Sequence, residues 1–303
     1  MIQDIAPYRY KNEYCPAPPS EEDLLLCYDG DRVLVREEGG KIAFPTFKEA
    51  KLYVDADRLC RDCTYLFAID GARFYLGSGL SADFPAGDDN TAPAGGECGY
   101  TWKDRQIFRN VGPKHLGFAG VTGWQLHRWY ENHRFCGRCG NAMEKDTKER
   151  MLFCPKCRVM EYPKICPAVI IAVTHKNRLL MSKYAGREYK KYALLAGFAE
   201  IGETVEETVE REVMEEVGLK VKNITYYKSQ PWSFSDTLLM GFFCELDGDE
   251  TVTLDEEELA LAQWFEREEI PAEPDGISLT NEMMMVFKEG REIIRQTLGD
   301  AVN

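Results

Sequence analysis

Long apolar runs are missing from this 303-residue sequence, although 44% of its residues are hydrophobic. No stretch reaches the ~18 consecutive apolar residues that a membrane-spanning helix requires. The N-terminal segment MIQDIAPYRYKNEY also lacks the positive segment and following apolar stretch of a secretory signal. We therefore expect a cytoplasmic protein with no membrane partner.

Positive charge is scarce, because 37 Lys and Arg residues stand against 51 Asp and Glu residues and give a net charge of −14. Nonspecific attraction to a nucleic-acid backbone, which depends on clustered Lys and Arg, is therefore not expected to dominate. Three local groups of basic residues could still attract a polyanion: His127-Arg128, His133-Arg134 and Arg187 to Lys191. Ordinary solvated charge is the simpler explanation for all three. The sequence has no internal repeat, and its length suggests about two domains.

Eleven cysteines are present, and their odd number and Cys-x-x-Cys spacing favour metal thiolates over disulfides. The pairs Cys136/Cys139 and Cys154/Cys157 are separated by fourteen residues. This spacing suits four thiolates around one tetrahedral Zn²⁺. Four sulfur ligands leave no open position for water, so we expect this zinc to be structural.

Other potential ligands near these pairs have simpler explanations. Cys60 and Cys63 form a third pair without a partner pair, and chance spacing in a reduced protein explains it. His127 and His133 precede the first zinc pair, but the four cysteines already complete the ligand shell. We therefore expect packing or surface roles for both histidines.

Residues 197–219, GFAEIGETVEETVEREVMEEVGL, are the most informative segment of the chain. Thr204 can cap the start of a helix, no Pro or Gly interrupts the next thirteen residues, and Gly218 follows the last apolar position. Four valines form a stripe on one face when side chains are projected at about 100° per residue. These valines are Val205, Val209, Val213 and Val217. The pattern predicts one helix with this stripe buried.

The six glutamates of the predicted helix divide into two groups. Three project to the remaining sides and are expected to be solvated: Glu206, Glu207 and Glu210. Glu212, Glu215 and Glu216 fall on an arc of roughly 100°, and Glu216 projects into the apolar stripe. Crowded and partly buried carboxylates require cations. Arg211 supplies one charge, and Mg²⁺ or Mn²⁺ is the natural complement because hard divalent ions prefer carboxylate oxygens.

This segment resembles the Nudix box, whose fixed positions it matches at Gly197, Glu203, Arg211, Glu212, Val213, Glu215, Glu216, Gly218 and Leu219. The resemblance implies hydrolysis of a nucleoside diphosphate linked to another group. It also implies a catalytic Mg²⁺ or Mn²⁺ bound by Glu212, Glu216, the carbonyl of Ala196 and Glu258. Glu258 lies in an acidic run that begins at Asp255, where a one-residue shift would select a neighbour. Glu215 is either a ligand or the group that orients water, and both Glu215 and Glu216 are candidates for the general base.

A second segment resembles one particular group within the Nudix family. Residues 229–242, SQPWSFSDTLLMGF, closely resemble the Ser-Gln-Pro-Trp-Pro-Phe-Pro segment of NudC-type NADH pyrophosphatases, which also remove NAD caps from RNA. The resemblance extends from roughly Gly123 to the C-terminus. Ser233 and Ser235 stand where that family usually has prolines, and we expect this loop to be less rigid than in the family.

The resemblance implies a homodimer that hydrolyses NADH or NAD⁺ to AMP and nicotinamide mononucleotide, with NAD-capped RNA as a further substrate. The implied substrate-binding residues are Phe198, Tyr162, Glu149, Gln230, Pro231, Trp232, Ser233, Phe234, Ser235, Asp236, Thr237 and Thr280. Trp232 and Phe234 suit stacking on flat rings, although aromatic residues in β-rich segments are also commonly core residues. ADP-ribose or a diadenosine polyphosphate is an alternative substrate, and a noncatalytic nucleotide or RNA-binding adaptor is an alternative of another class.

These patterns predict an α+β protein with three parts. Residues 1–130 form a β-rich N-terminal Nudix-like domain, residues 131–162 a four-cysteine zinc ribbon, and residues 163–303 a Nudix α/β/α sandwich with a mixed sheet. Within the first part, the Gly-, Ala-, Pro- and Asp-rich segment from Ser81 to Gly99 predicts a mobile loop. Helices are expected from Gly123 into the ribbon and near Asn281 to Leu298.

Overall fold

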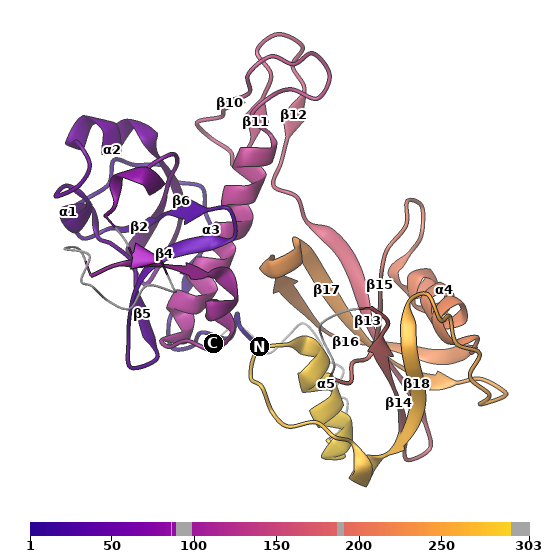
Figure 1. The fold of residues 1–303 in the computed structure, drawn as a ribbon. Helices are drawn as coiled ribbons and strands as arrows, with labels where there is room; N and C mark the ends of the chain where they lie inside the picture. Colours follow the sequence, from indigo (N-terminus) through magenta and orange to yellow (C-terminus); the bar gives the residue numbers. More distant parts are fainter. Residues whose placement is uncertain (86, 89–98, 187–190, 292–303) are drawn as a thin grey trace. The chain divides into compact units, whose positions relative to one another are not determined.

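The structure is a computed structural model that describes residues 1–85, 87–88, 99–186 and 191–291 (Figure 1). The chain divides into two compact units. The N-terminal unit comprises residues 2–164 and 233–235, and the box unit comprises residue 1, residues 165–232 and the chain from residue 236 onward. Much of the loop expected between Ser81 and Gly99, most of the basic segment Arg187 to Lys191 and the end of the expected C-terminal helix lie outside the described residues.

The box unit contains a mixed six-stranded sheet with the order β16-β17-β13-β14-β18, and β15 also pairs with β13. Its strands are β13 (Cys166–His175), β14 (Arg178–Tyr184), β15 (Leu195–Phe198), β16 (Val221–Trp232), β17 (Thr237–Leu246) and β18 (Leu259–Glu266). The pairing of β13 with β17 is parallel, and the other pairings are antiparallel. Its helices are α4 (Val205–Val217) and α5 (Leu279–Lys288), and a short 3₁₀ helix, η4 (Arg267–Glu269), follows β18.

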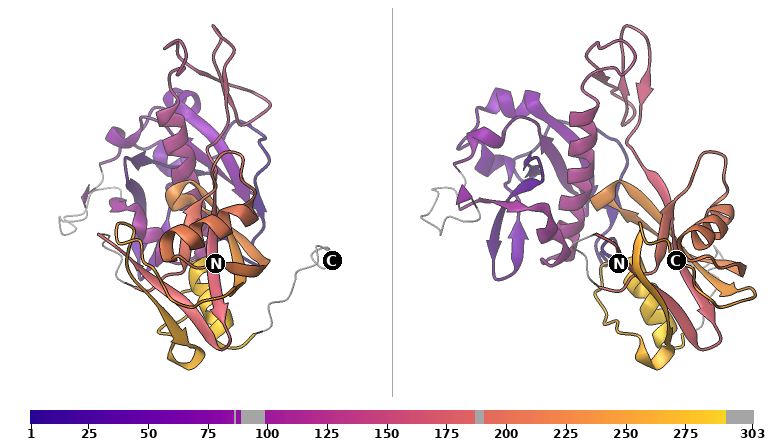
Figure 2. Two further views of the ribbon diagram at one scale, coloured as in Figure 1. Left: turned by 90° about the vertical axis from the view of Figure 1, so that its right-hand side faces the viewer. Right: turned by 45° about the vertical axis from the view of Figure 1, so that its right-hand side comes forward.

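Alternating residues of β13 explain why helices cover both faces of this sheet. Val169, Ile171 and Val173 pack in the cluster that contains the valines of α4. Ile170 and Ala172 point to the other face and pack in the cluster that contains the methionines of α5. Successive side chains of a strand point to opposite faces, so one apolar strand supplies both cores. The predicted α/β/α sandwich is confirmed (Figure 1, Figure 2).

The N-terminal unit is β-rich, as predicted from the sequence. Two of its sheets have the orders β1-β6-β7-β2 and β3-β4-β9-β8, with β5 paired to β4. The strands are β1 (Tyr10–Lys11), β2 (Leu24–Leu26), β3 (Tyr28–Asp29), β4 (Arg32–Glu38), β5 (Lys41–Ala43), β6 (Cys63–Ile69), β7 (Ala72–Gly77), β8 (Gly87–Asp88) and β9 (Thr101–Asp104). The helices are α1 (Phe47–Ala50), α2 (Ala56–Asp62), α3 (Lys114–Asn132) and the 3₁₀ helices η1 (Ser81–Asp83), η2 (Arg105–Arg109) and η3 (Ser233–Ser235).

Helix α3 begins nine residues before Gly123, the start that the sequence predicts. Its first half contains Gly117, Gly120 and Gly123, which weaken a helical pattern in the sequence. A Cβ at Gly120 would overlap the ring of Phe108, and one at Gly123 would overlap Leu26. The glycines therefore allow the helix to pack closely against its own unit, and this requirement is not visible in the sequence pattern.

The zinc ribbon follows α3 and consists of three short antiparallel strands, β10 (Glu144–Lys145), β11 (Leu152–Phe153) and β12 (Met160–Glu161). At the other end of the chain, α5 begins two residues before the expected Asn281 and ends at Lys288. Glu289 caps it, and Gly290 has a φ of +63°. No helix in the described part of the chain is long and apolar enough to cross a membrane.

Gly218 ends α4 in the left-handed region, with φ +69°, and a Cβ there would lie 2.9 Å from Thr253 Cβ. Gly276 has nearly the same φ, +65°, but open space around it. We expect Gly218→Ala to lower the free energy of unfolding by about 1–3 kcal/mol more than Gly276→Ala, because only the first substitution adds overpacking. Denaturant unfolding of the two variants measures the difference, and equal losses would contradict the packing at Thr253.

Candidate active site

The predicted box helix is α4, and both of its ends are capped. Thr204 Oγ1 accepts from the backbone N–H of Glu207, and the Glu207 carboxylate accepts from the N–H of Thr204 in return, which is a capping box. At the other end, the N–H of Gly218 donates to Met214 O at 3.0 Å. Glu207 is exposed, as predicted, and it also stabilises the first turn of the helix.

Arg211 lies at the centre of the site and hydrogen-bonds two separate segments. Its Nε and Nη2 donate to the two carboxylate oxygens of Glu203 at 2.6 and 3.0 Å. Its Nη1 donates to Glu212 at 2.8 Å and to Glu215 at 2.9 Å, and Nη2 also reaches Phe198 O at 2.9 Å. The hydrogen bonds from Arg211 lower the pKa of Glu203 to about 2, so Glu203 is ionised and ties the loop before the helix to the helix itself.

Glu212 is 8% exposed and lies directly against Gly197 in β15. A Cβ at Gly197 would overlap the Glu212 carboxylate, so the first glycine of the box leaves the space that this acid fills. Burial raises the pKa of Glu212, Arg211 opposes that increase, and the charges of Glu215 and Glu258 add to it. Glu258 itself is exposed, and its backbone carbonyl accepts from the N–H of Ala185 at 2.9 Å.

Glu216 is 2% exposed, which confirms the projection of a carboxylate into the buried face of α4. The loop that precedes β18 is hydrogen-bonded to the same end of the helix: Asp255 N donates to Glu216 O at 3.0 Å, and Thr253 N donates to Val217 O at 2.9 Å. Glu215 differs from the other two acids, since its side chain is 59% exposed. Its contact with Arg211, rather than burial, fixes its position.

The oxygen donors of this region suit a hard divalent cation. Glu212 and Glu216 are buried acids on successive turns of α4, and Gly197, whose missing Cβ makes room for Glu212, directly follows Ala196. Within the part of the chain that the structure describes, however, only the four cysteines bring three or more potential ligand atoms within 4.8 Å of one another. The carboxylates are close but do not form an assembled ligand shell.

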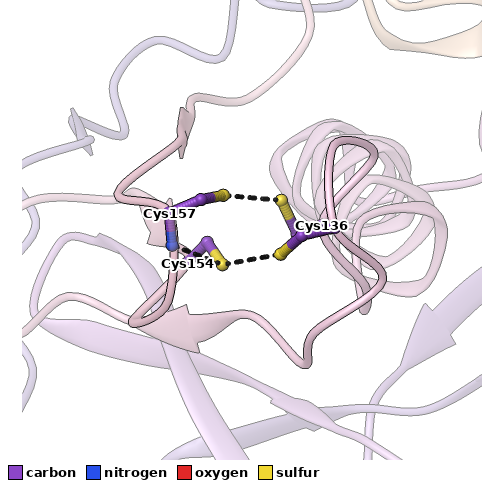
Figure 3. Close-up of side chains that lie close together, drawn as sticks. Cys136, Cys154 and Cys157 are labelled. Atoms are coloured by element: carbon purple, nitrogen blue, oxygen red, sulfur yellow. Dashed lines mark hydrogen bonds between the residues drawn. The ribbon is translucent and has the colours of Figure 1, made fainter.

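The four predicted zinc ligands, Cys136, Cys139, Cys154 and Cys157, do form such a group (Figure 3). The Sγ atoms of Cys136 and Cys157 are 3.4 Å apart, and those of Cys139 and Cys154 are 3.5 Å apart. The backbone N–H of Cys157 is the main cause that lowers the pKa of the Cys154 thiol to about 6. The geometry fits one tetrahedral, structural Zn²⁺.

The other potential zinc ligands near the ribbon contact other residues or lie outside the group of four cysteines. His133 Nδ1 is 2.8 Å from Trp129 O, and the His127 ring stacks on Tyr28 with centroids 5.2 Å apart. Neither histidine belongs to the cysteine group. Cys60 is exposed, Cys63 is partly buried, and neither is part of a ligand group among the described residues.

The segment that resembles the family's substrate motif occupies β16, η3 and the start of β17. The Gln230 amide is fully buried: it donates to Ile277 O at 2.8 Å and accepts from Leu279 N at 2.7 Å. Gln230 thus joins β16 to the start of α5. Pro231 is exposed and Trp232 is partly buried.

Phe234 belongs to the N-terminal unit, where it is 7% exposed. The Cζ atom of Arg109 lies 4.3 Å from its ring centroid, and Arg105 Nη1 donates to its carbonyl at 3.4 Å. Both arginines precede the region of the family resemblance, and no motif in the sequence marks them as functional. Of the neighbouring predicted residues, Ser233, Asp236 and Thr237 are buried, whereas Ser235 is exposed.

The remaining predicted residues are at or near the surface of their units. Tyr162 is 53% exposed, and its hydroxyl donates to Glu149 at 2.9 Å, so these two ribbon residues are brought together. Phe198 is 54% exposed and follows the glycine that faces Glu212. Thr280 lies partly buried in the first turn of α5. Their roles toward a substrate stay predictions.

Loss of one zinc ligand is expected to remove the metal. Cys154→Ser should lower the zinc content well below the about one ion per chain expected of the wild type, since a tetrahedral structural site needs all four ligands. Cys15→Ser is the matched control, because Cys15 is exposed and outside the group. Atomic emission on dialysed protein gives the zinc content. Full zinc in Cys154→Ser, or equal loss in Cys15→Ser, would contradict the assignment.

Two protein-family models match this chain. The model of the NADH pyrophosphatase zinc ribbon domain matches residues 131–162, and the model of the NUDIX domain matches residues 164–284. Relatives named NAD-capped RNA hydrolase NudC, from Salmonella heidelberg (strain SL476) and Salmonella newport (strain SL254), are 41% identical over 171 residues. That alignment covers 56% of this chain and 65% of each relative.

Among solved structures, a NUDIX hydrolase from Nitrosomonas europaea aligns with a TM-score of 0.46 and 24% identity, covering 52% of this chain and 92% of that one. The chain spans just under two thirds of the length of the curated relatives that it matches. From the ribbon cysteines to α5, motif, geometry and family model agree. Residues 131–162 therefore carry the NADH pyrophosphatase zinc ribbon domain, and residues 164–284 carry the NUDIX domain.

Proposed function

We propose that this protein hydrolyses the pyrophosphate bond of NADH or NAD⁺ to nicotinamide mononucleotide and AMP. The observation that carries the proposal is the pair of buried acids, Glu212 and Glu216, on one helix. Arg211 donates to Glu212, and its other bonds reach Glu203, Glu215 and Phe198 O. Burying carboxylates is costly unless cations compensate, and a diphosphate-cleaving site needs such cations. The relatives named NAD-capped RNA hydrolase support a dinucleotide as the substrate.

Glu212, Glu216, Glu258 and the carbonyl of Ala196 would hold Mg²⁺ or Mn²⁺ in this proposal. Such an ion, when bound, neutralises charge on the phosphates and lowers the pKa of bound water. Contacts within the protein position these donors. Gly197 leaves space for the Glu212 carboxylate, and Asp255 N donates a hydrogen bond to Glu216 O.

Hydrolysis also requires a group that accepts the proton of the attacking water. Glu215 is exposed and oriented by Arg211, which suits it to take a proton from water and release it to solvent. Glu216 is buried, so it is better suited to hold a cation than to exchange protons with bulk water. We therefore assign the base role to Glu215 and the ligand role to Glu216.

Flat rings at the surface support binding of a dinucleotide. Phe198 presents an exposed ring beside the box, and Tyr162 presents another from the ribbon with its hydroxyl fixed by Glu149. Aromatic faces bind nucleobases by stacking at little polar cost. We propose that these residues, with Trp232, Thr280 and the segment from Gln230 to Thr237, bind the substrate.

NAD-capped RNA is proposed as a further substrate, supported by the name of the curated relatives. A homodimer is proposed on the family resemblance. Sedimentation of the zinc-loaded protein measures the oligomeric state.

The cysteines support a cytoplasmic location. All ten cysteines in the described residues have free thiols, and four of them are placed as zinc ligands.

Substrate preference and a matched pair of variants test the proposed function. The value of kcat/KM for NADH or NAD⁺ should exceed that for ADP-ribose or a diadenosine polyphosphate by at least about tenfold, because the binding residues suit a nicotinamide dinucleotide. Glu216→Gln should lower NADH turnover by on the order of 10²-fold or more, with zinc content unchanged.

Glu210→Gln removes the same charge from the exposed side of the same helix and should stay within about twofold of the wild type. Near-native turnover of Glu216→Gln would overturn the site. A clear preference for ADP-ribose would keep the site and change the substrate, whereas tight binding of NAD-capped RNA without turnover would support a noncatalytic adaptor.

A further inference from the structure

A cavity of about 930 Å³ lies within the N-terminal unit, outside the box unit and the residues assigned to its chemistry. Its walls are the C-terminal half of α3, the β3–β4 turn, the segment after β7 and the zinc ribbon. Figure 1 shows the ribbon continuing from the end of α3 in this unit. Ligand cavities in proteins commonly have volumes of about 300–1,000 Å³, so this one has room for a nucleotide-sized molecule.

Three cationic side chains line the cavity, Arg128, Arg134 and Lys145, together with two histidines, His127 and His133. Lys145 donates a hydrogen bond to Thr64 Oγ1, and its Nζ lies 5.2 Å from the centroid of the Tyr130 ring. The residue as a whole is exposed, but packing around its ammonium group desolvates it and lowers its pKa. A desolvated cation gains more from a nearby anion than a fully hydrated cation does.

Arg128 is held in place by an aromatic stack. Its Cζ lies 4.7 Å from the centroid of Trp124, and Arg105 lies 4.0 Å from the same centroid. Trp124 is 1% exposed and its indole donates to Gly30 O at 3.2 Å, while Arg105 pairs with Asp31 at 3.1 Å. The turn that forms one wall is therefore tied to α3, and Arg128 is positioned before any ligand binds.

The acids that line the cavity already have cationic partners. Asp29 pairs with Arg32, Asp31 with Arg105, and Glu131 with Arg134 at 3.6 Å. Pairing reduces the repulsion that these carboxylates would exert on an anion. Carboxylates also accept hydrogen bonds from the hydroxyl groups of a ribose, which an inorganic anion lacks. The combination therefore favours a sugar phosphate over a bare anion.

An aromatic face completes the set of nucleotide-binding groups. The rings of Tyr28 and His127 stack 5.2 Å apart with an interplanar angle of 23°, and both line the cavity. Tyr28 is fixed because its hydroxyl donates to Gly120 O at 2.6 Å. Burial lowers the pKa of His127, so its ring is mostly neutral near pH 7 and serves as a flat surface.

We propose that this cavity is a second, noncatalytic site for a phosphate-bearing nucleotide, in which Lys145 and Arg134 contact the phosphate. The ligand is either a free nucleoside phosphate or a nucleotide within a single-stranded RNA. Cations, a ribose-binding carboxylate and an aromatic face recognise both forms. The proposal stands apart from NADH hydrolysis, because none of its residues belongs to the box unit.

Calorimetric titration of the full, zinc-loaded chain tests the proposal with two probes: AMP, and a five-nucleotide uridine RNA without a terminal phosphate. The double variant Arg134→Gln/Lys145→Gln should weaken binding of at least one probe by about tenfold or more, since charge-assisted contacts are lost. The control Arg9→Gln/Lys48→Gln removes the same charge from exposed positions outside the cavity, and binding should be unchanged. Loss for AMP alone identifies a free nucleotide, and loss for the RNA alone identifies a polynucleotide.

Equal affinities of the double variant and the wild type for both probes, or no cavity-dependent binding in the wild type, would overturn the proposal. Zinc content and thermal unfolding verify that the double variant is folded. If it is not, Lys145→Arg, which keeps the charge, should bind like the wild type, whereas Lys145→Gln should not. NADH turnover is measured on the same wild-type protein, so failure of the proposed hydrolysis is seen separately from failure at the cavity.

Discussion

The guanidinium of Arg211 is the interaction on which the arrangement of the box depends. It binds both oxygens of Glu203, one oxygen each of Glu212 and Glu215, and the carbonyl of Phe198. A planar guanidinium with several donors can satisfy this many acceptors at once, whereas a lysine cannot. The loop before α4 and the face of α4 that carries the acids are thereby fixed to each other. Its positive charge also offsets part of the repulsion between Glu212 and Glu215.

The glycines and the helix caps make that arrangement possible. Gly197 leaves the space that the Glu212 carboxylate fills, and Gly218 allows α4 to end where the loop of Thr253 packs against it. Thr204 and Glu207 fix the first turn, which sets the rotation of the helix and hence the direction of Glu216 into the buried face. Steric contact explains Gly197, and steric contact together with the left-handed backbone explains Gly218.

Elements with strong local patterns were predictable from the sequence, and features set by tertiary contacts were not. The valine stripe and caps predicted α4, its buried Glu216 and the exposed side of the helix, and the paired cysteines predicted the zinc group. The early start of α3 was missed because glycines that fit against Phe108 and Leu26 weaken its helical pattern. Three features depend on residues that are distant in sequence. They are the contacts of Arg105 and Arg109 with Phe234, the exposure of Glu215, and the cavity beside the zinc ribbon.

The most direct test of the central role of Arg211 is a double-mutant cycle with Glu203. Arg211→Gln and Glu203→Gln should each lower NADH turnover by on the order of 10²-fold, because misplaced groups lose that much rate even when they do not touch the substrate. If the two residues act as one unit, the double variant should be no worse than the weaker single variant. Turnover losses that multiply in the double variant would show independent roles and contradict the account.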